Sequence, residues 1–140
     1  MNHVLVTGAN RGIGLELCRQ LKDRGDAVFA ACRQTSQALD DLNLTVIEGV
    51  DVRDENSILK ITETLGDRRI DWLLNNAGVL SVESLDNLDY DAMTYQFMIN
   101  TLGPLKVTTT LRPSLAANAK VGIVTSRMGS IDDNTSGGYY

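Results

Sequence analysis

The chain has 140 residues, with 13 Lys and Arg against 18 Asp and Glu and a formal net charge of −5. This length supports one core and marks no second domain, and a mildly acidic surface makes nucleic acid and anionic membranes unsuitable partners. The chain has no run near the roughly 18 apolar residues of a membrane helix and no signal-peptide layout at its start. We therefore expect a soluble, cytoplasmic protein.

Short apolar runs alternate with helical patterns along the chain, which is typical of repeated βα units around a parallel sheet. The predicted strands are residues 3–7, 27–32, 44–50, 70–75 and 120–126. Right-handed crossovers give the strand order 3-2-1-4-5, with a switch point between the first and fourth strands. We predict a single α/β domain over residues 1–140, a doubly wound parallel sheet with its ligand at the carboxyl edge.

The first predicted strand leads into a glycine-rich turn, Thr7-Gly8-Ala9-Asn10-Arg11-Gly12-Ile13-Gly14, which opens a helix. Glycine lacks a Cβ and tolerates positive φ, so the backbone of such a turn approaches a pyrophosphate closely. The free N–H groups at the start of the helix then hold the phosphates. The alternative interpretation is a tight strand-to-helix turn that binds nothing.

The helices are predicted from apolar residues that recur at three- and four-residue steps. They cover residues 12–24, 36–42, 54–65 and 89–111. In the last of these, Gly103-Pro104 interrupts the pattern without ending it, which indicates a kink in a long helix packed on the sheet.

Cys18 falls inside the first predicted helix and Cys32 at the end of the second predicted strand, with no C-x-x-C pattern near either. We interpret them as reduced, packed thiols. His3, the only histidine, begins a strand far from the glycine turn and is interpreted as structural. We therefore expect no metal site and no histidine-dependent triad.

The conspicuous motifs all fall at the carboxyl ends of predicted strands, which meet at one edge of a parallel sheet. In strand order they are residues 8–14, Arg33, Asp51-Val52, Asn75-Asn76-Ala77-Gly78 and Ser126.

These motifs resemble those of the short-chain dehydrogenase/reductase family: TGxxxGxG at 7–14, Asp51-Val52, NNAG at 75–78, Asn100 ahead of Gly103-Pro104, and Ser126. Residues 126–140 further resemble the branch with bacterial C-factor and carbonyl-reductase-like proteins. The resemblance implies an NAD(P)-binding Rossmann domain and an oxidoreductase acting on CH–OH or C=O groups. It covers all 140 residues, but the last strands and helices of the family domain are missing, so we expect a truncated chain.

The resemblance also implies which residues hold the cofactor. The pyrophosphate turn would be shaped by Gly8, Gly12 and Gly14 and lined by Asn10, Arg11 and Ile13. The adenine would be faced by Asp51 of the Asp51-Val52 pair. The wall beside the ribose and the nicotinamide would be formed by Asn76, Ala77 and Gly78. A second interpretation of Asn75 and Asn76 is that their amides tie neighbouring strands together, which is compatible with the first.

For catalysis, the resemblance implies that Ser126 binds the substrate oxygen and that Asn100 kinks the long helix and binds a water of the proton relay. Alternatively, Ser126 caps a turn and Asn100 is a solvated or back-bonded helix residue. Tyr139 lies 13 residues beyond Ser126, a family spacing for the catalytic tyrosine, but the chain contains no Y-x-x-x-K. Either Tyr139 or a tyrosine past Tyr140 is then the catalytic one, the Lys lies past Tyr140, and we expect the 140 residues alone to be inactive.

The charge pattern indicates which dinucleotide is bound. A site for NAD places Asp or Glu about 18 residues beyond the last glycine. Here Cys32 and then Arg33 stand at that point. The Arg33 guanidinium suits a 2′-phosphate, and Arg11 adds a second positive charge, unless both are ordinary surface arginines. We expect NADP(H) rather than NAD.

The predicted function is hydride transfer between NADP(H) and a small-molecule carbonyl or alcohol. One alternative is a non-catalytic dinucleotide-binding module or sensor, and another is an interaction domain, such as a flavodoxin-like module, that binds no nucleotide. The family resemblance also implies a homo-oligomer through the long helix around Asn100.

Overall fold

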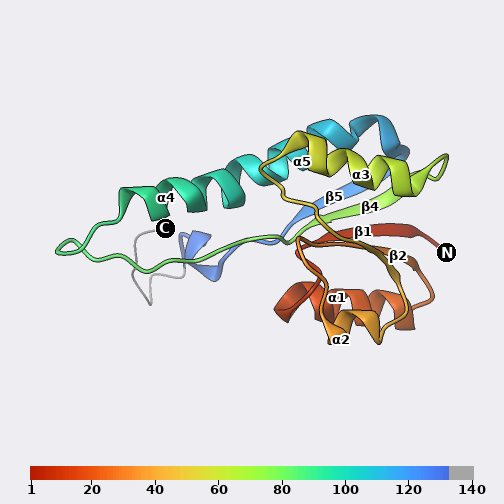
Figure 1. Ribbon diagram of the computed structural model, residues 1–140, viewed down its shortest axis with the longest axis horizontal. Coiled ribbons are helices and arrows are strands. Elements are labelled where there is room, and N and C mark those ends of the chain that lie inside the picture. Colours follow the sequence, from red (N-terminus) through yellow and green to blue (C-terminus); the bar gives the residue numbers. More distant parts are fainter. Residues whose placement is uncertain (133–140) are drawn as a thin grey trace.

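The computed structural model describes residues 1–132, and its centre is a five-stranded parallel sheet (Figure 1). The strands are β1 (His3–Thr7), β2 (Ala27–Ala31), β3 (Thr45–Ile47), β4 (Ile70–Asn75) and β5 (Leu115–Ile123). They lie in the order β3-β2-β1-β4-β5. Both the α/β Rossmann-type class and the strand order predicted from the sequence are confirmed.

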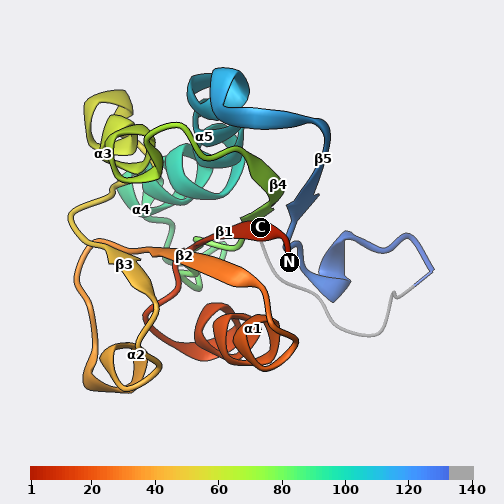
Figure 2. The ribbon, with the colours of Figure 1, turned by 90° about the vertical axis from the view of Figure 1, so that its right-hand side faces the viewer.

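Helices cover both faces of this sheet. They are α1 (Gly12–Asp23), α2 (Gln37–Asp40), α3 (Glu55–Leu65), α4 (Tyr90–Phe97) and α5 (Gly103–Leu111), with 3₁₀ turns at Arg112–Ser114 and Arg127–Gly129. Figure 2 shows α1 and α2 on one face and α3 and α5 on the other. In Figure 1, α4 continues away from α5 and projects beyond the sheet. Within the described residues, no helix is long and apolar enough to cross a membrane.

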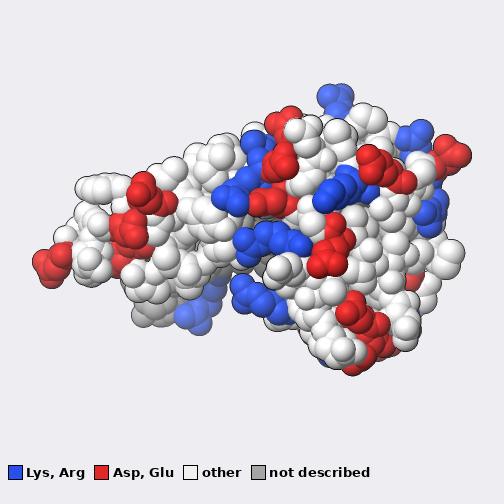
Figure 3. All heavy atoms as spheres, viewed as in Figure 1, with Lys and Arg blue, Asp and Glu red and all other residues white. Residues whose placement is uncertain are grey.

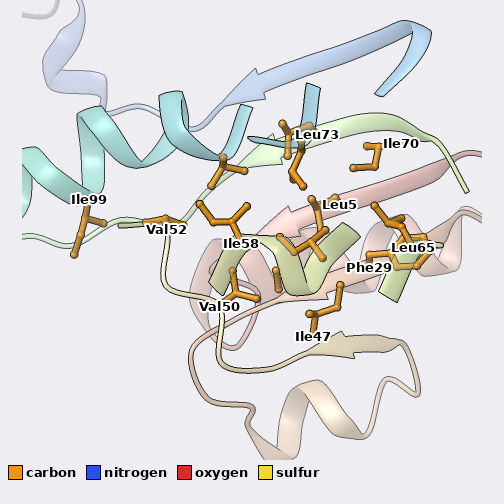
Figure 4. Packing of buried hydrophobic residues seen from close by; sticks show 14 residues of the cluster. Leu5, Phe29, Ile47, Val50, Val52, Ile58, Leu65, Ile70, Leu73 and Ile99 are labelled. Atoms are coloured by element: carbon orange, nitrogen blue, oxygen red, sulfur yellow. The ribbon is translucent and has the colours of Figure 1, made fainter. Parts of the chain in front are cut away.

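Alternate strand residues supply the two halves of the core, because successive side chains of a strand point to opposite faces. Val4 and Val6 of β1 pack in the cluster with Cys18 of α1, whereas Leu5 packs in the cluster with Ile58 of α3. Figure 4 shows this second cluster between the sheet and the α3 side. Because both faces of β1 and β2 are buried, these two strands are nearly continuous apolar runs, whereas the edge strand β5 is largely exposed.

Three strands differ from their predicted limits, and the smallest change is in β2, which ends at Ala31 instead of residue 32. β3 ends at Ile47 instead of residue 50, because Gly49 has a φ of 75° and takes the backbone out of the extended conformation. β5 covers Leu115–Ile123 instead of 120–126, because its earlier part pairs with Ile70 ahead of a register shift. Asp51 and Ser126 consequently lie in the loops beyond the strands and not at the strand ends.

The long helix predicted over 89–111 is divided into α4, a π-helical turn at Met98–Leu102 and α5. The predicted interruption is real, but it begins before Gly103-Pro104. Pro104 lies in the first turn of α5, directly after the π-helical turn, and its missing N–H removes one helical hydrogen bond at this interruption. At Gly103 a Cβ would come 2.9 Å from a methyl carbon of Val52, so glycine lets α5 approach the loop after β3.

Candidate functional site

A hollow of about 240 Å³ opens at the carboxyl edge of the sheet, around the ends of β1, β2 and β4 and the loop after β3. It brings together nearly all the residues predicted to bind a cofactor: Gly8, Asn10, Arg11, Gly12, Ile13, Arg33, Asp51, Val52, Asn76, Ala77 and Gly78. Its lining does not include Gly14, Asn100 or Ser126. Tyr139 lies outside the described residues.

The glycine turn is shaped by close approaches and by positive φ angles. Gly8 has a φ of 66°, and a Cβ on it would come 2.7 Å from the Ala77 Cα. Gly12 has a φ of 55° with no atom near the position of a Cβ, which leaves open space where it lines the hollow. A Cβ on Gly14 would overlap the Gly8 carbonyl and the Asn76 amide, so Gly14 acts by letting α1 begin against β1 and β4.

The ends of β1 and β4 are joined by a reciprocal set of hydrogen bonds. The buried Thr7 hydroxyl accepts from the backbone N–H groups of Asn76 and Ala77, both at 3.1 Å. The Asn76 side-chain amide donates to the carbonyls of Thr7 at 3.0 Å and Gly8 at 3.1 Å. The interpretation that a strand-end amide ties neighbouring strands together therefore holds for Asn76, but it is wrong for Asn75, whose amide donates to the Thr108 hydroxyl of α5 at 3.3 Å.

Asn100, in the π-helical turn, holds another part of the wall. Its side-chain oxygen accepts from the Val79 N–H at 2.9 Å, and its side-chain nitrogen donates to the Val79 carbonyl at 2.8 Å. Val79 follows Gly78 and lines the hollow. Asn100 therefore fixes the segment after β4, while its predicted role in holding a water stays a prediction.

The charged groups of the hollow are two arginines and one carboxylate. Arg11 and Arg33 line it, and neither has an ion-pair partner within residues 1–132. Asp51 is the one acidic lining residue and is bound by the Arg53 side chain, Nε to Oδ1 at 3.0 Å and Nη2 to Oδ2 at 2.6 Å. These bonds from Arg53 hold the pKa of Asp51 below its ordinary value. Figure 3 shows Lys and Arg side chains gathered over the middle of one face, with acidic side chains among them.

Cys32 also lines the hollow, at the end of β2, and it is buried and free, as is Cys18. Burial raises the pKa of Cys32 to about 11 and the pKa of Cys18 to about 12. Both are therefore neutral thiols at physiological pH and not nucleophiles. The described residues contain no cluster of His, Cys, Asp and Glu that could hold a metal ion.

Sequence reasoning missed several lining residues: Thr7, Ala31, Cys32, Val50, Val79 and Ile99. Most are apolar residues next to a predicted motif, and the sequence alone does not distinguish an apolar residue of the core from one that lines the hollow. Thr7 carried a usable signal, because it is a buried hydroxyl at the end of a strand and begins the glycine motif.

The model of the short chain dehydrogenase family matches residues 2–139. A 1-hydroxy-2-glutathionyl-2-methyl-3-butene dehydrogenase from Rhodococcus sp. (strain AD45) is 45% identical, over 100% of this chain and 63% of its own. C-signal from Myxococcus xanthus is 49% identical over 51% of this chain and 45% of its own. The crystal structure of a carbonyl reductase from Pseudomonas aeruginosa PAO1 in complex with NADP is 32% identical, with a TM-score of 0.86, over 94% of this chain and 64% of that one. The chain thus spans less than two thirds of the length of these relatives.

Proposed function

The chain belongs to the short-chain dehydrogenase family, and we propose that it binds NADP(H) in the hollow at the carboxyl edge of the sheet and serves hydride transfer to or from a small-molecule carbonyl or alcohol. When bound, the nicotinamide supplies or accepts the hydride. The chain's own residues then have the tasks of binding the dinucleotide, orienting it and handling the proton on the substrate oxygen.

The fit between the hollow and a dinucleotide rests on the glycine turn. Gly12 offers open space at the start of α1, where free N–H groups and the helix dipole favour a pyrophosphate. The wall formed by Asn76, Ala77 and Gly78 would flank the ribose and the nicotinamide. Its backbone is held in place because the Thr7 hydroxyl accepts hydrogen bonds from two of its N–H groups.

The observation that carries the choice of NADP(H) is the charge at the end of β2. Arg33 follows a buried cysteine there, no acid stands at the point that would repel a 2′-phosphate, and Arg11 adds a second guanidinium across the hollow. The one lining carboxylate, Asp51, is neutralised by its own arginine. The NADP in the Pseudomonas carbonyl reductase supports the same choice.

For the chemical step, we propose that Ser126 binds the substrate oxygen and that Asn100 keeps the segment after Gly78 in place beside the nicotinamide. Tyr139 as the proton donor remains a prediction from its spacing. The 140 residues contain no Y-x-x-x-K, so we propose that they bind the dinucleotide without efficient turnover. The rate of NADPH oxidation with a panel of aldehydes and quinones distinguishes binding alone from full catalysis. Oxidation of NADPH at the rates ordinary for the family would contradict the proposal.

The proposed partner of the chain is a second copy, paired through α4. No residue of α4 is buried, and Tyr90, Met93 and Phe97 recur at three- and four-residue steps with 71%, 37% and 54% of their surface exposed. An apolar stripe of this kind on a projecting helix is typical of an interface.

The cofactor proposal is tested by calorimetric titration, in which NADPH and NADH are each titrated into the unaltered chain and into the Arg33→Ala variant. Loss of a charge-assisted phosphate contact should weaken NADPH binding about tenfold or more and change NADH binding less than about twofold. Arg19→Ala is the matched control, because Arg19 lies on α1, outside the hollow, paired with Glu16. Equal losses for the two cofactors in Arg33→Ala would overturn the assignment of Arg33 to the phosphate.

A further inference from the structure

Tyr95 of α4 contacts two arginines: Arg33, which lines the hollow just after β2, and Arg53, which binds Asp51. The rest of α4 stands clear of the sheet (Figure 1). Its hydroxyl oxygen accepts a hydrogen bond from Arg33 Nη1 at 3.3 Å, across 62 residues of sequence. The guanidinium carbon of Arg53 lies 4.8 Å from the centre of its ring. Tyr95 does not line the hollow itself, so it acts from behind Arg33.

Arg53 supplies a fixed support for this ring. Its guanidinium is held by both oxygens of Asp51, its backbone N–H donates to Asp51 Oδ1 at 2.9 Å, and its carbonyl accepts from Lys106 Nζ at 2.9 Å. A guanidinium so anchored stacks on the tyrosine ring without being drawn into the hollow. The two arginines thus differ: Arg53 is paired with Asp51, whereas no carboxylate among residues 1–132 lies within ion-pair distance of Arg33.

We propose that Tyr95 is a positioning residue that holds the Arg33 guanidinium toward the hollow and thereby sets the preference for a ligand with a 2′-phosphate. This rests on the proposed function, since it requires that the hollow take the adenosine end of NADP(H). An exposed arginine loses many rotamers when it binds a phosphate, and a side chain already held in place loses fewer. The contact therefore favours the phosphorylated ligand and leaves the unphosphorylated one unaffected.

The test uses two fragments that differ only in the phosphate, adenosine 2′,5′-bisphosphate and 5′-AMP, each titrated calorimetrically. Tyr95→Phe keeps the ring beneath Arg53 and removes the hydroxyl from Arg33. It should weaken the bisphosphate about three- to tenfold, the effect of losing one hydrogen bond, and change 5′-AMP less than twofold. Thr94→Val, which removes an exposed hydroxyl from the same helix outside the apolar stripe, where it donates only to the Tyr90 carbonyl, is the control and should change neither.

A second pair of variants tests whether the effect passes through Arg33. In an Arg33→Ala background, Tyr95→Phe should cause no further loss, because the group that it positions is absent. The inference is overturned if Tyr95→Phe leaves the bisphosphate unchanged, weakens both fragments equally, or keeps its full effect without Arg33. If the unaltered chain does not prefer the bisphosphate at all, the NADP(H) proposal fails and this inference with it. If it does prefer the bisphosphate and Tyr95→Phe keeps that preference, only the inference fails.

Discussion

Replacing Gly14 by alanine should destabilise the chain, although alanine is the better helix former by about 0.5–1 kcal/mol. The added Cβ would overlap the Gly8 carbonyl oxygen and the Asn76 amide nitrogen. Overpacking of this kind costs about 1–3 kcal/mol. Displacing the amide would also break its bonds to Thr7 and Gly8, each contributing about 0.5–1.5 kcal/mol. Taking the middle of each range and subtracting the helix preference, we expect a net loss of about 3 kcal/mol.

Urea unfolding followed by the fluorescence of Trp72, the only tryptophan, measures this loss. With a slope of about 2 kcal/mol per M, the midpoint should fall by about 1–2 M at unchanged slope. Gly66→Ala tests backbone strain alone, because Gly66 has φ 57° and ψ −125° but open space around a Cβ, so only strain of about 1–3 kcal/mol arises. If Gly14→Ala is as stable as the unaltered chain, the close approach of α1 to β1 and β4 is wrong.

Two further predictions concern charge and assembly. Because Arg53 holds the pKa of Asp51 below its ordinary value, the pair adds stability that is present above about pH 4 and is lost as the pH falls through the folded-state value. Asp51→Asn should therefore reduce the fall in unfolding free energy between neutral and acid pH, and urea curves with the same fall for both proteins would contradict the pairing. Phe97→Asp, at the carboxyl end of the exposed stripe on α4, should convert dimers to monomers in light scattering by placing a charge in an apolar interface, and unchanged dimers would exclude this face.

The sheet order and the position of the hollow could be predicted from the sequence because both follow from strong local signals. Apolar runs mark the strands, crossover handedness fixes their order, and the glycine motif and the NNAG motif then meet at one edge. Strand ends were harder to predict. The limit of β3 depends on the backbone angle at Gly49, and the start of β5 depends on an irregular pairing with β4, neither of which leaves a periodic pattern.

The contacts that support the site could not be predicted, because they join residues distant in sequence. Asn100 reaches Val79 and Tyr95 reaches Arg33 only once α4 and the π-helical turn have been placed beside the loops after β4 and β2. A tyrosine or an asparagine within a helical sequence pattern does not indicate which distant residue its side chain will contact. The pattern around Gly103-Pro104 indicated an interruption, but nothing in the pattern indicates that it is a π-helical turn or that it begins at Met98.

The π-helical turn at Met98–Leu102 also sets the rotational phase between the two helices that it joins. Each residue of an α-helix advances its side chain by about 100°, and a π turn accommodates one residue more than an α turn does. Because the extra residue is taken up within one turn, its loss would restore a continuous α-helix and leave α4 and α5 close to their present relative orientation. Loss of a second residue has no such turn to shorten, so it would rotate α4 by about 100° relative to α5 and carry Tyr95 away from Arg33. The segment should therefore tolerate the loss of one residue better than the loss of two.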